Sequence, residues 1–143
     1  MNKKRCTPSL HITKFYNRHS KGVNAMRKEN LVSIWVGNFN SEDDFDEYIG
    51  ENYDEDGDMV PSIFMNDFEM GHIDHDFQES EFFDKKLTKD DIVDFSYAET
   101  FIDKINEANL MGNAIILLYD FEYSGEVQTK NNVNYIGAYD YKK

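Results

Sequence analysis

The stretch Leu31-Val-Ser-Ile-Trp-Val-Gly-Asn-Phe39 decides the fold of this 143-residue chain. It is rich in β-branched and aromatic residues and is apolar on both faces, which is typical of a buried strand. A second stretch, Ala114-Ile-Ile-Leu-Leu-Tyr119, has the same character and continues as an alternating edge through Phe121 and Tyr123. The two stretches predict buried strands, the second of them central in the sheet.

Helix N-terminal capping patterns predict the first of the helices directly after the opening strand. Ser41-Glu-Asp-Asp44 combines an N-cap serine with acids in the first turn, where negative charge is favoured by the helix dipole. The predicted helix ends near Ile49, and Gly50 is its stop signal. Its inward-facing residues are expected to be Phe45, Tyr48 and Ile49.

Two further capping patterns lie in the second half of the chain. Thr88-Lys-Asp-Asp91 predicts a short helical turn, and Ser96 opens a predicted helix that runs to about Leu110. Gly112 stands where a C-terminal cap is expected. The inward-facing residues of the second helix are expected to be Phe101, Ile102, Ile105 and Ala108.

The remaining elements complete an α+β domain. Residues 62–68 resemble a short strand, and residues 133–141 alternate as a closing strand that is expected to form a hairpin with the strand before it. The element order predicts a single α+β domain with a mostly antiparallel sheet and helices packed on one face.

Charge divides the chain into two unequal parts. Residues 1–30 hold eight Lys or Arg and one acid, whereas residues 31–84 hold 17 Asp or Glu and no base. We expect residues 1–29 to be a basic, flexible N-terminal arm and residues 30–143 to be an acidic domain. Two interpretations of the arm stay open: a native tail, or an extension upstream of a domain that begins at Met26.

Several classes of protein are excluded by composition. The formal net charge of −13 disfavours binding to a phosphate backbone, which requires a positive surface. The single cysteine, Cys6, excludes an intramolecular disulfide. The longest apolar run, residues 114–119, is far shorter than the roughly 20 residues of a membrane span. We therefore expect a cytoplasmic protein that binds neither nucleic acid nor membrane.

No motif predicts a metal, a cofactor or catalysis. The Asp54–Asp58 loop resembles the start of a calcium loop, but Met59 and Met65 occupy its sixth and twelfth positions, where an EF-hand needs Gly and Glu. His72 and His75 lack the further ligands of a zinc set. There is no P-loop, nucleophile elbow or dinucleotide turn, so we expect a protein that is not an enzyme.

Four segments resemble the immunity protein 22 family, whose members are encoded beside bacterial polymorphic toxins. They are the opening strand over residues 32–41, the acidic helix ending in Tyr48-Ile49, the segment Ile73–Glu79 and the strand over residues 113–119. The resemblance covers about residues 31–123. It implies a non-enzymatic protein that binds and blocks a cognate toxin domain.

The acidic stretch and the resemblance point to the same kind of partner. An acidic surface steers a basic partner, and a nuclease toxin domain carries a basic substrate groove. The alternative is a DNA-mimic inhibitor or an acidic binding module for another, non-toxin partner. The candidate partner-binding residues, with Tyr or Phe nearby as anchors, are Asp67, Glu69, Asp74, Asp76 and Glu79.

Overall fold

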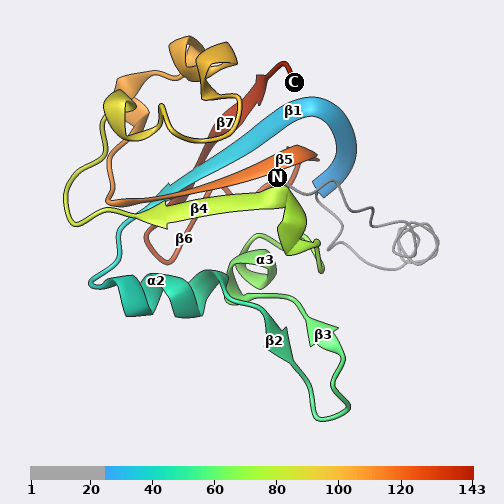
Figure 1. Cartoon of the computed structure of the whole chain (residues 1–143). Coiled ribbons are helices and arrows are strands. Elements are labelled where there is room, and N and C mark those ends of the chain that lie inside the picture. Colours follow the sequence, from blue (N-terminus) through green and yellow to red (C-terminus); the bar gives the residue numbers. More distant parts are fainter. Residues whose placement is uncertain (1–24) are drawn as a thin grey trace.

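A five-stranded antiparallel sheet forms the centre of the molecule (Figure 1). The computed structural model describes residues 25–143. The strands lie in the order β4-β5-β1-β7-β6, so the α+β class with an antiparallel sheet is confirmed. Their bounds are β1 Ala25–Gly37, β4 Gln78–Phe82, β5 Ala114–Tyr123, β6 Thr129–Lys130 and β7 Val133–Asp140.

The order of the strands corrects one prediction about the sheet. β7 does not form a hairpin with β5; both strands pair with β1, which lies between them. The opening segment, with its buried run from Leu31 to Gly37, therefore occupies the middle of the sheet. The short partner of β7 is β6, through the pairs Thr129 with Asn134 and Lys130 with Val133.

β1 begins at Ala25, six positions before the predicted start of the strand. Ala25 pairs with Tyr123 and Arg27 with Phe121, so residues 25–29 belong to the sheet and the expected domain boundary at residue 30 falls within a strand. Polar side chains at positions 27–30 hid this continuation from the apolar pattern. The rest of the predicted flexible arm, residues 1–24, lies outside the described residues.

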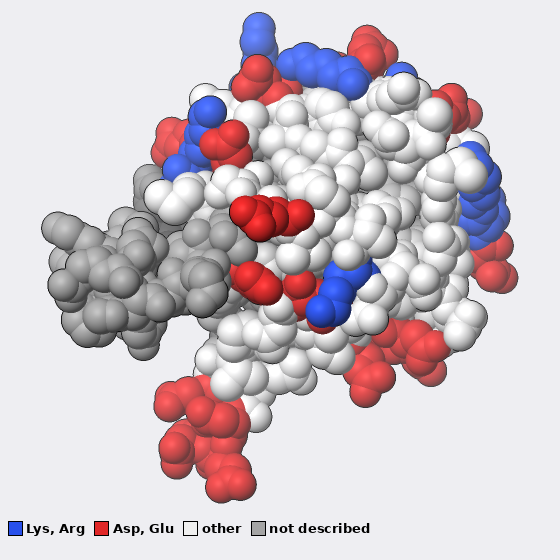
Figure 2. Space-filling view, turned by 180° about the vertical axis from the view of Figure 1, so that it is seen from behind, with Lys and Arg blue, Asp and Glu red and all other residues white. Residues whose placement is uncertain are grey.

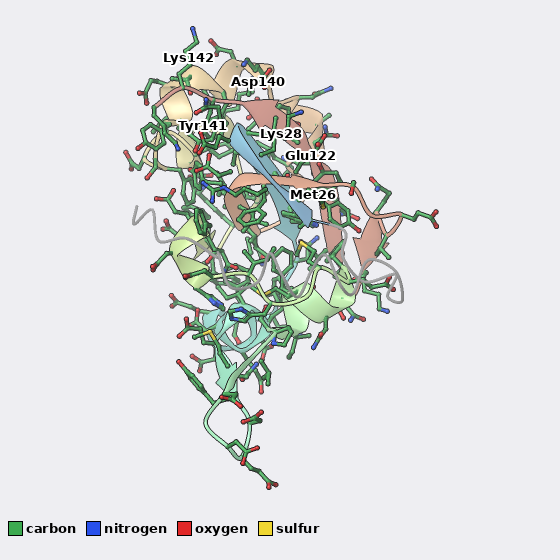
Figure 3. The ribbon with its side chains drawn as sticks, turned by 90° about the vertical axis from the view of Figure 1, so that its right-hand side faces the viewer. Met26, Lys28, Glu122, Asp140, Tyr141 and Lys142 are labelled. Carbon is green, nitrogen blue, oxygen red and sulfur yellow. The ribbon has the colours of Figure 1, made fainter. Side chains whose placement is uncertain are left out.

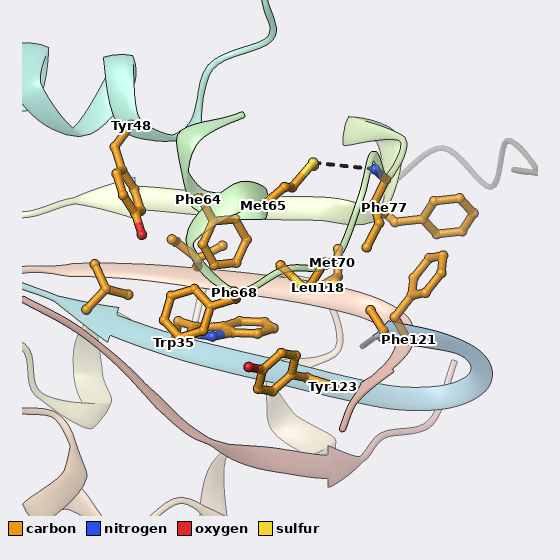
Figure 4. Packing of buried hydrophobic residues seen from close by; sticks show 14 of the residues in the cluster. Trp35, Tyr48, Phe64, Met65, Phe68, Met70, Phe77, Leu118, Phe121 and Tyr123 are labelled. Carbon is orange, nitrogen blue, oxygen red and sulfur yellow. Dashed lines mark hydrogen bonds between the residues drawn. The ribbon is translucent and has the colours of Figure 1, made fainter. Parts of the chain in front are cut away.

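Alternation along the strands places a hydrophobic core on each face of the sheet. The core on one face includes Trp35, Ile116 and Leu118, and α2 (Glu42–Ile49) and α3 (Ile63–Asp67) cover it. We call this the helical face; Figure 4 shows its packing. The core on the other face, which we call the turn face, includes Val32, Ile34, Val36, Ile115, Leu117 and Tyr119.

The two α-helices lie on one face, and both begin at a capping serine. Ser41 Oγ accepts a hydrogen bond from the Asp44 amide, as the capping pattern predicts. Residues 62–68, predicted as a short strand, instead contain α3, because Ser62 Oγ accepts from the Met65 amide. The serine after Pro61 is thus an N-cap, and the apolar residues behind it form a buried helical turn.

The turn face is covered by four short 3-10 helices rather than by the predicted helix over residues 96–110. Tyr97 has a left-handed backbone, φ 62°, which breaks a continuous helix at its start. Phe101, Ile105 and Leu110 are buried at uneven spacings, while Ala108 is exposed. The bounds are η2 Lys89–Asp91, η3 Ala98–Thr100, η4 Ile102–Lys104 and η5 Glu107–Asn109.

A small hairpin projects from the helical face beyond α2 and α3 (Figure 1). Its strands are β2 (Asn52–Tyr53) and β3 (Met59–Val60), which form a separate two-stranded sheet. The short helix η1 (His75–Phe77) precedes β4. None of the helices within residues 25–143 has the length and apolar character needed to cross a membrane.

Candidate functional site

Ten exposed carboxylates lie on α2 and the β2–β3 hairpin, and we call residues 42–58 the acidic arm. No Lys or Arg occurs between Leu31 and Asp84, so no cation of this stretch neutralises them. Figure 2 shows the acidic side chains at the end of the molecule that carries α2 and the projecting hairpin. The ten residues are Glu42, Asp43, Asp44, Asp46, Glu47, Glu51, Asp54, Glu55, Asp56 and Asp58.

Local backbone interactions explain why so many like charges can lie together at the tip of the hairpin. Asp54 Oδ1 accepts hydrogen bonds from the amides of Asp56 and Asp58, each at 2.9 Å. Gly57 adopts φ 84°, a left-handed conformation that favours glycine. In α2, three acids lie in the first turn, where the helix N-terminus stabilises negative charge.

Two histidines connect the hairpin to the body of the protein. His75 Nε2 lies 3.0 Å from the carbonyl oxygen of Ile49 at the end of α2, and its Nδ1 lies 3.4 Å from Glu51 Oε2. His72 Nε2 lies 2.7 Å from Met59 Sδ on β3. Burial and the nearby His75 lower the pKa of His72. These contacts fix the base of the hairpin against α2 and η1.

Asp74 and Asp76, both half-buried, border the base of the hairpin. Asp74 is the N-cap of η1 and accepts a hydrogen bond from the Asp76 amide at 2.8 Å. The Asp74 charge also acts on His72, as does that of Glu51, which places these groups in one electrostatic neighbourhood. The two predicted residues are therefore next to the acidic arm.

Asp67 is the last residue of α3, and Glu69 follows the helix two residues later, on the helical face. Asp67 Oδ2 accepts hydrogen bonds from the Tyr48 hydroxyl and from Asn131 Nδ2, each at 3.0 Å. This carboxylate therefore joins α2 to the turn between β6 and β7. Glu69 is exposed and has a left-handed backbone, φ 57°.

Glu79 is not an exposed carboxylate and does not share a surface with the other four candidates. It accepts from the Ser96 amide at 3.0 Å, from Ser96 Oγ at 2.5 Å and from the Tyr119 hydroxyl at 2.9 Å. Tyr119 belongs to the core of the turn face. Glu79 thus holds the segment of 3-10 helices to the sheet. It also uses the serine that the sequence indicated as a helix cap.

Two buried tyrosines that bond to carboxylates, Tyr48 and Tyr119, predict a loss of stability at alkaline pH. Burial, and then the charge of Glu79, raises the pKa of Tyr119, while burial and Asp67 raise the pKa of Tyr48. Because the unfolded chain loses these protons near pH 10 and the folded protein keeps them, the stabilisation is complete below about pH 10 and is lost as pH rises above it.

We expect the free energy of unfolding, measured by urea titration, to fall between about pH 10 and pH 12. Tyr119→Phe is expected to reduce this fall. An equal fall in the parent protein and in Tyr119→Phe would contradict the assignment to Tyr119.

Three carboxylates of the hairpin tip are close enough to share a cation. Oxygens of Asp54, Asp56 and Asp58 lie within 4.8 Å of one another, and all three residues are exposed. Asp54 already serves as the acceptor for the turn. Within residues 25–143, His72 and His75 do not belong to any group of three metal-ligating side chains. That the protein uses no metal stays a prediction.

The sequence pattern did not single out the acids of α2 and the hairpin as binding residues. The helix dipole accounts for the α2 acids, and the Asp54–Asp58 loop matches only the start of a calcium loop. The signal that sequence reasoning missed is a pair of large apolar residues, Tyr53 and Met59, on either side of this acidic loop; in the structure they are 58% and 40% exposed. A pair of large apolar side chains among so many acids is unusual for a solvated loop.

Comparison with known protein families gives a match to most of the chain. The family model described as Immunity protein 22 matches residues 32–142, so the match includes β7 as well as the segments that carried the resemblance. Neither the curated proteins nor the solved structures gave a match. Since the family model covers residues 32–142 of the 143-residue chain, this protein belongs to the immunity protein 22 family.

Proposed function

We propose that this protein neutralises a cognate bacterial toxin domain with a basic active-site groove, such as a nuclease domain, by covering that groove with the acidic arm. The family supports a role as an immunity protein. The observation that carries the finer proposal is the set of ten exposed carboxylates on residues 42–58, with no Lys or Arg from Leu31 to Asp84.

The physical basis of the proposal is charge complementarity. A groove that binds a phosphate backbone presents Lys and Arg, and carboxylates on a rigid element can pair with those side chains in place of phosphates. The summed negative field also speeds the encounter with a basic partner, particularly at low salt. The protein acts by occupying the groove, and its role requires no catalysis.

The acidic arm is the centre of the proposed contact, and four of the sequence-predicted residues extend it. Asp74 and Asp76 lie beside its base, and Asp67, at the end of α3, and Glu69 lie on the same face. Glu79 is left out, because its carboxylate bonds to Ser96 and Tyr119 on the other face. The contact would form in the cytoplasm of the cell that makes the toxin.

Co-expression tests this proposal. The toxin domain encoded beside the gene for this protein is expressed in bacteria with the parent chain or with a charge-reversal variant, and survival is counted. The parent chain is expected to restore growth. The variant Asp43→Lys, Asp46→Lys, Glu47→Lys on α2 is expected to lose protection, with an association rate lowered at least about tenfold.

The matched control reverses three exposed acids on the turn face, Asp90, Asp94 and Asp103. Asp91 is unsuitable for this control, because its carboxylate accepts from the Thr88 amide at 2.8 Å and pairs with Lys85. Protection lost in the control but kept in the α2 variant would place the contact on the turn face. Protection kept in both variants would contradict a contact through the acidic surface.

A further inference from the structure

The β2–β3 hairpin combines three features in one element. It projects beyond the body of the protein (Figure 1), its tip carries four exposed carboxylates, and its two strands present large apolar side chains to solvent. Figure 3, a view from the side, shows how far the hairpin extends beyond the helices. The tip residues are Asp54, Glu55, Asp56 and Asp58.

Tyr53 and Met59 form one apolar patch. They are directly opposed in the antiparallel pair, so their side chains lie on the same face of the hairpin. Tyr53 is 58% exposed and Met59 is 40% exposed. Ile63, at the start of α3, is exposed as well, so three of the six large exposed hydrophobic residues of the described chain lie between residues 53 and 63.

The patch is held in place from the base of the hairpin. The Tyr53 hydroxyl donates to Glu51 Oε1 at 3.3 Å, and Glu51 in turn lies beside His75. Met59 Sδ contacts His72. Side chains that are already oriented lose less conformational freedom on binding, which favours affinity. A solvated loop that served solubility alone would need neither the apolar pair nor its supports.

We propose that the β2–β3 hairpin is the element that enters the basic groove of the toxin domain, with Tyr53 and Met59 as its apolar anchor. The inference rests on the proposed function. It assigns separate roles to the carboxylates and to the apolar residues of the hairpin. The tip carboxylates face the cations of the groove and speed association, as exposed charges do. The anchor slows dissociation, because buried aromatic and apolar side chains carry most of the energy of an interface.

The occupant follows from the charges around the patch. An apolar pair surrounded by carboxylates cannot lie against an acidic surface without burying like charges together, and a second copy of this acidic arm would meet the same repulsion. A partner with an apolar pocket inside a basic rim satisfies both features. A groove that binds nucleotides has this character, since it contacts bases as well as phosphates.

The test measures binding to a catalytically inactive form of the toxin domain by surface plasmon resonance. The double variant Tyr53→Ser, Met59→Ser is expected to bind at least about 30-fold more weakly, with most of the change in the dissociation rate. The control Val93→Ser, Met111→Ser changes two exposed apolar residues outside the arm and is expected to bind within about threefold of the parent. Tyr53→Phe keeps the ring but removes the hydrogen bond to Glu51, so it is expected to bind more weakly than the parent and more tightly than the double variant.

The results of these binding measurements distinguish the hairpin assignment from the proposed function. Unchanged circular dichroism and melting temperature in the double variant would show that a weaker affinity comes from the interface. Parent-like binding of the double variant, together with loss of binding in the α2 charge-reversal variant, would overturn the hairpin assignment and leave the proposed function standing. A parent chain that does not bind the toxin domain would overturn both.

Discussion

Replacing Trp35 with alanine is expected to lower the free energy of unfolding by about 3–5 kcal/mol. Trp35 is fully buried near the C-terminal end of β1, the middle strand of the sheet. Four aromatic rings surround it on the helical face, and Figure 4 labels Phe64, Phe68 and Tyr123 among them. Truncation would leave a large cavity that these rings cannot fill without moving. Their centroids lie at 4.9 Å for Phe64, 5.8 Å for Phe68, 5.4 Å for Tyr123 and 5.0 Å for Tyr135.

The control for this prediction is Trp35→Phe. Within residues 25–143, the indole Nε1 of Trp35 is buried with no hydrogen-bond partner, so phenylalanine removes an unsatisfied donor while it keeps most of the apolar contact. Urea unfolding followed by circular dichroism measures both variants, and we expect Trp35→Phe to lose much less stability than Trp35→Ala. A loss below about 1 kcal/mol for Trp35→Ala would contradict the packing described.

The second large effect is expected at Asp120, the one charged side chain among the buried polar residues described. Its Oδ1 accepts from the Asn30 amide at 3.0 Å and from the Tyr141 hydroxyl at 2.6 Å, and its Oδ2 accepts from Lys143 Nζ at 3.0 Å. Arg27 Nη2 lies 4.0 Å away. The Asp120 carboxylate thus connects β5 to Asn30 in β1 and to the C-terminal residues Tyr141 and Lys143.

Asp120→Ala is expected to cost about 2–4 kcal/mol of unfolding free energy, because it leaves the buried Tyr141 hydroxyl and the Asn30 amide without this acceptor. The left-handed backbone of Asp120, φ 64°, adds to the cost in alanine. Glu122→Ala, two residues along β5, is the control. Its partner Lys28 lies 3.8 Å away (both are labelled in Figure 3) and both side chains are about half exposed, so we expect a change below about 1 kcal/mol. Equal effects at the two positions would contradict a structural role for Asp120.

Asp120 also shows where reasoning from the sequence was sufficient and where it was not. The alternation of apolar residues correctly predicts β5 from Ala114 to Tyr123. It does not reveal that the left-handed Asp120 shifts the register, so that Phe121 and Tyr123 join the core of the helical face although Tyr119 belongs to the turn face. That shift depends on the Asp120 carboxylate, which binds Asn30 near the start of the described chain and Tyr141 and Lys143 at its C-terminal end.

Helix predictions succeeded where local interactions decide and failed where tertiary contacts decide. Ser41 and Ser62 are both N-caps, but α3 has only five residues and its apolar content resembles a strand. The segment after Ser96 has helical capping residues. The Ser96 hydroxyl donates to Glu79 and therefore does not cap a helix. The apolar residues of this segment pack against the sheet at spacings that do not match a helical period.

Gly112 is required for a different reason from the one expected: a Cβ there would lie 2.3 Å from the carbonyl oxygen of Gly37.

The acidic character of the candidate site could be predicted from the sequence, but its place on the molecule could not. Charge counting identifies the stretch from Leu31 to Asp84 without distinguishing a free carboxylate from one used internally. Glu79 and Asp67 accept hydrogen bonds that hold the fold, whereas the acids of α2 and the hairpin tip are exposed. Only the three-dimensional structure separates these two groups and brings Tyr53 opposite Met59.

Hydrogen–deuterium exchange of this protein with and without the inactive toxin domain tests the central claim most directly. We expect the toxin domain to slow amide exchange in residues 42–60, which form α2 and the β2–β3 hairpin, and to leave residues 88–110 on the turn face unchanged. Exchange that is slowed in residues 88–110 and unchanged in residues 42–60 would contradict the claim that the acidic arm binds the toxin.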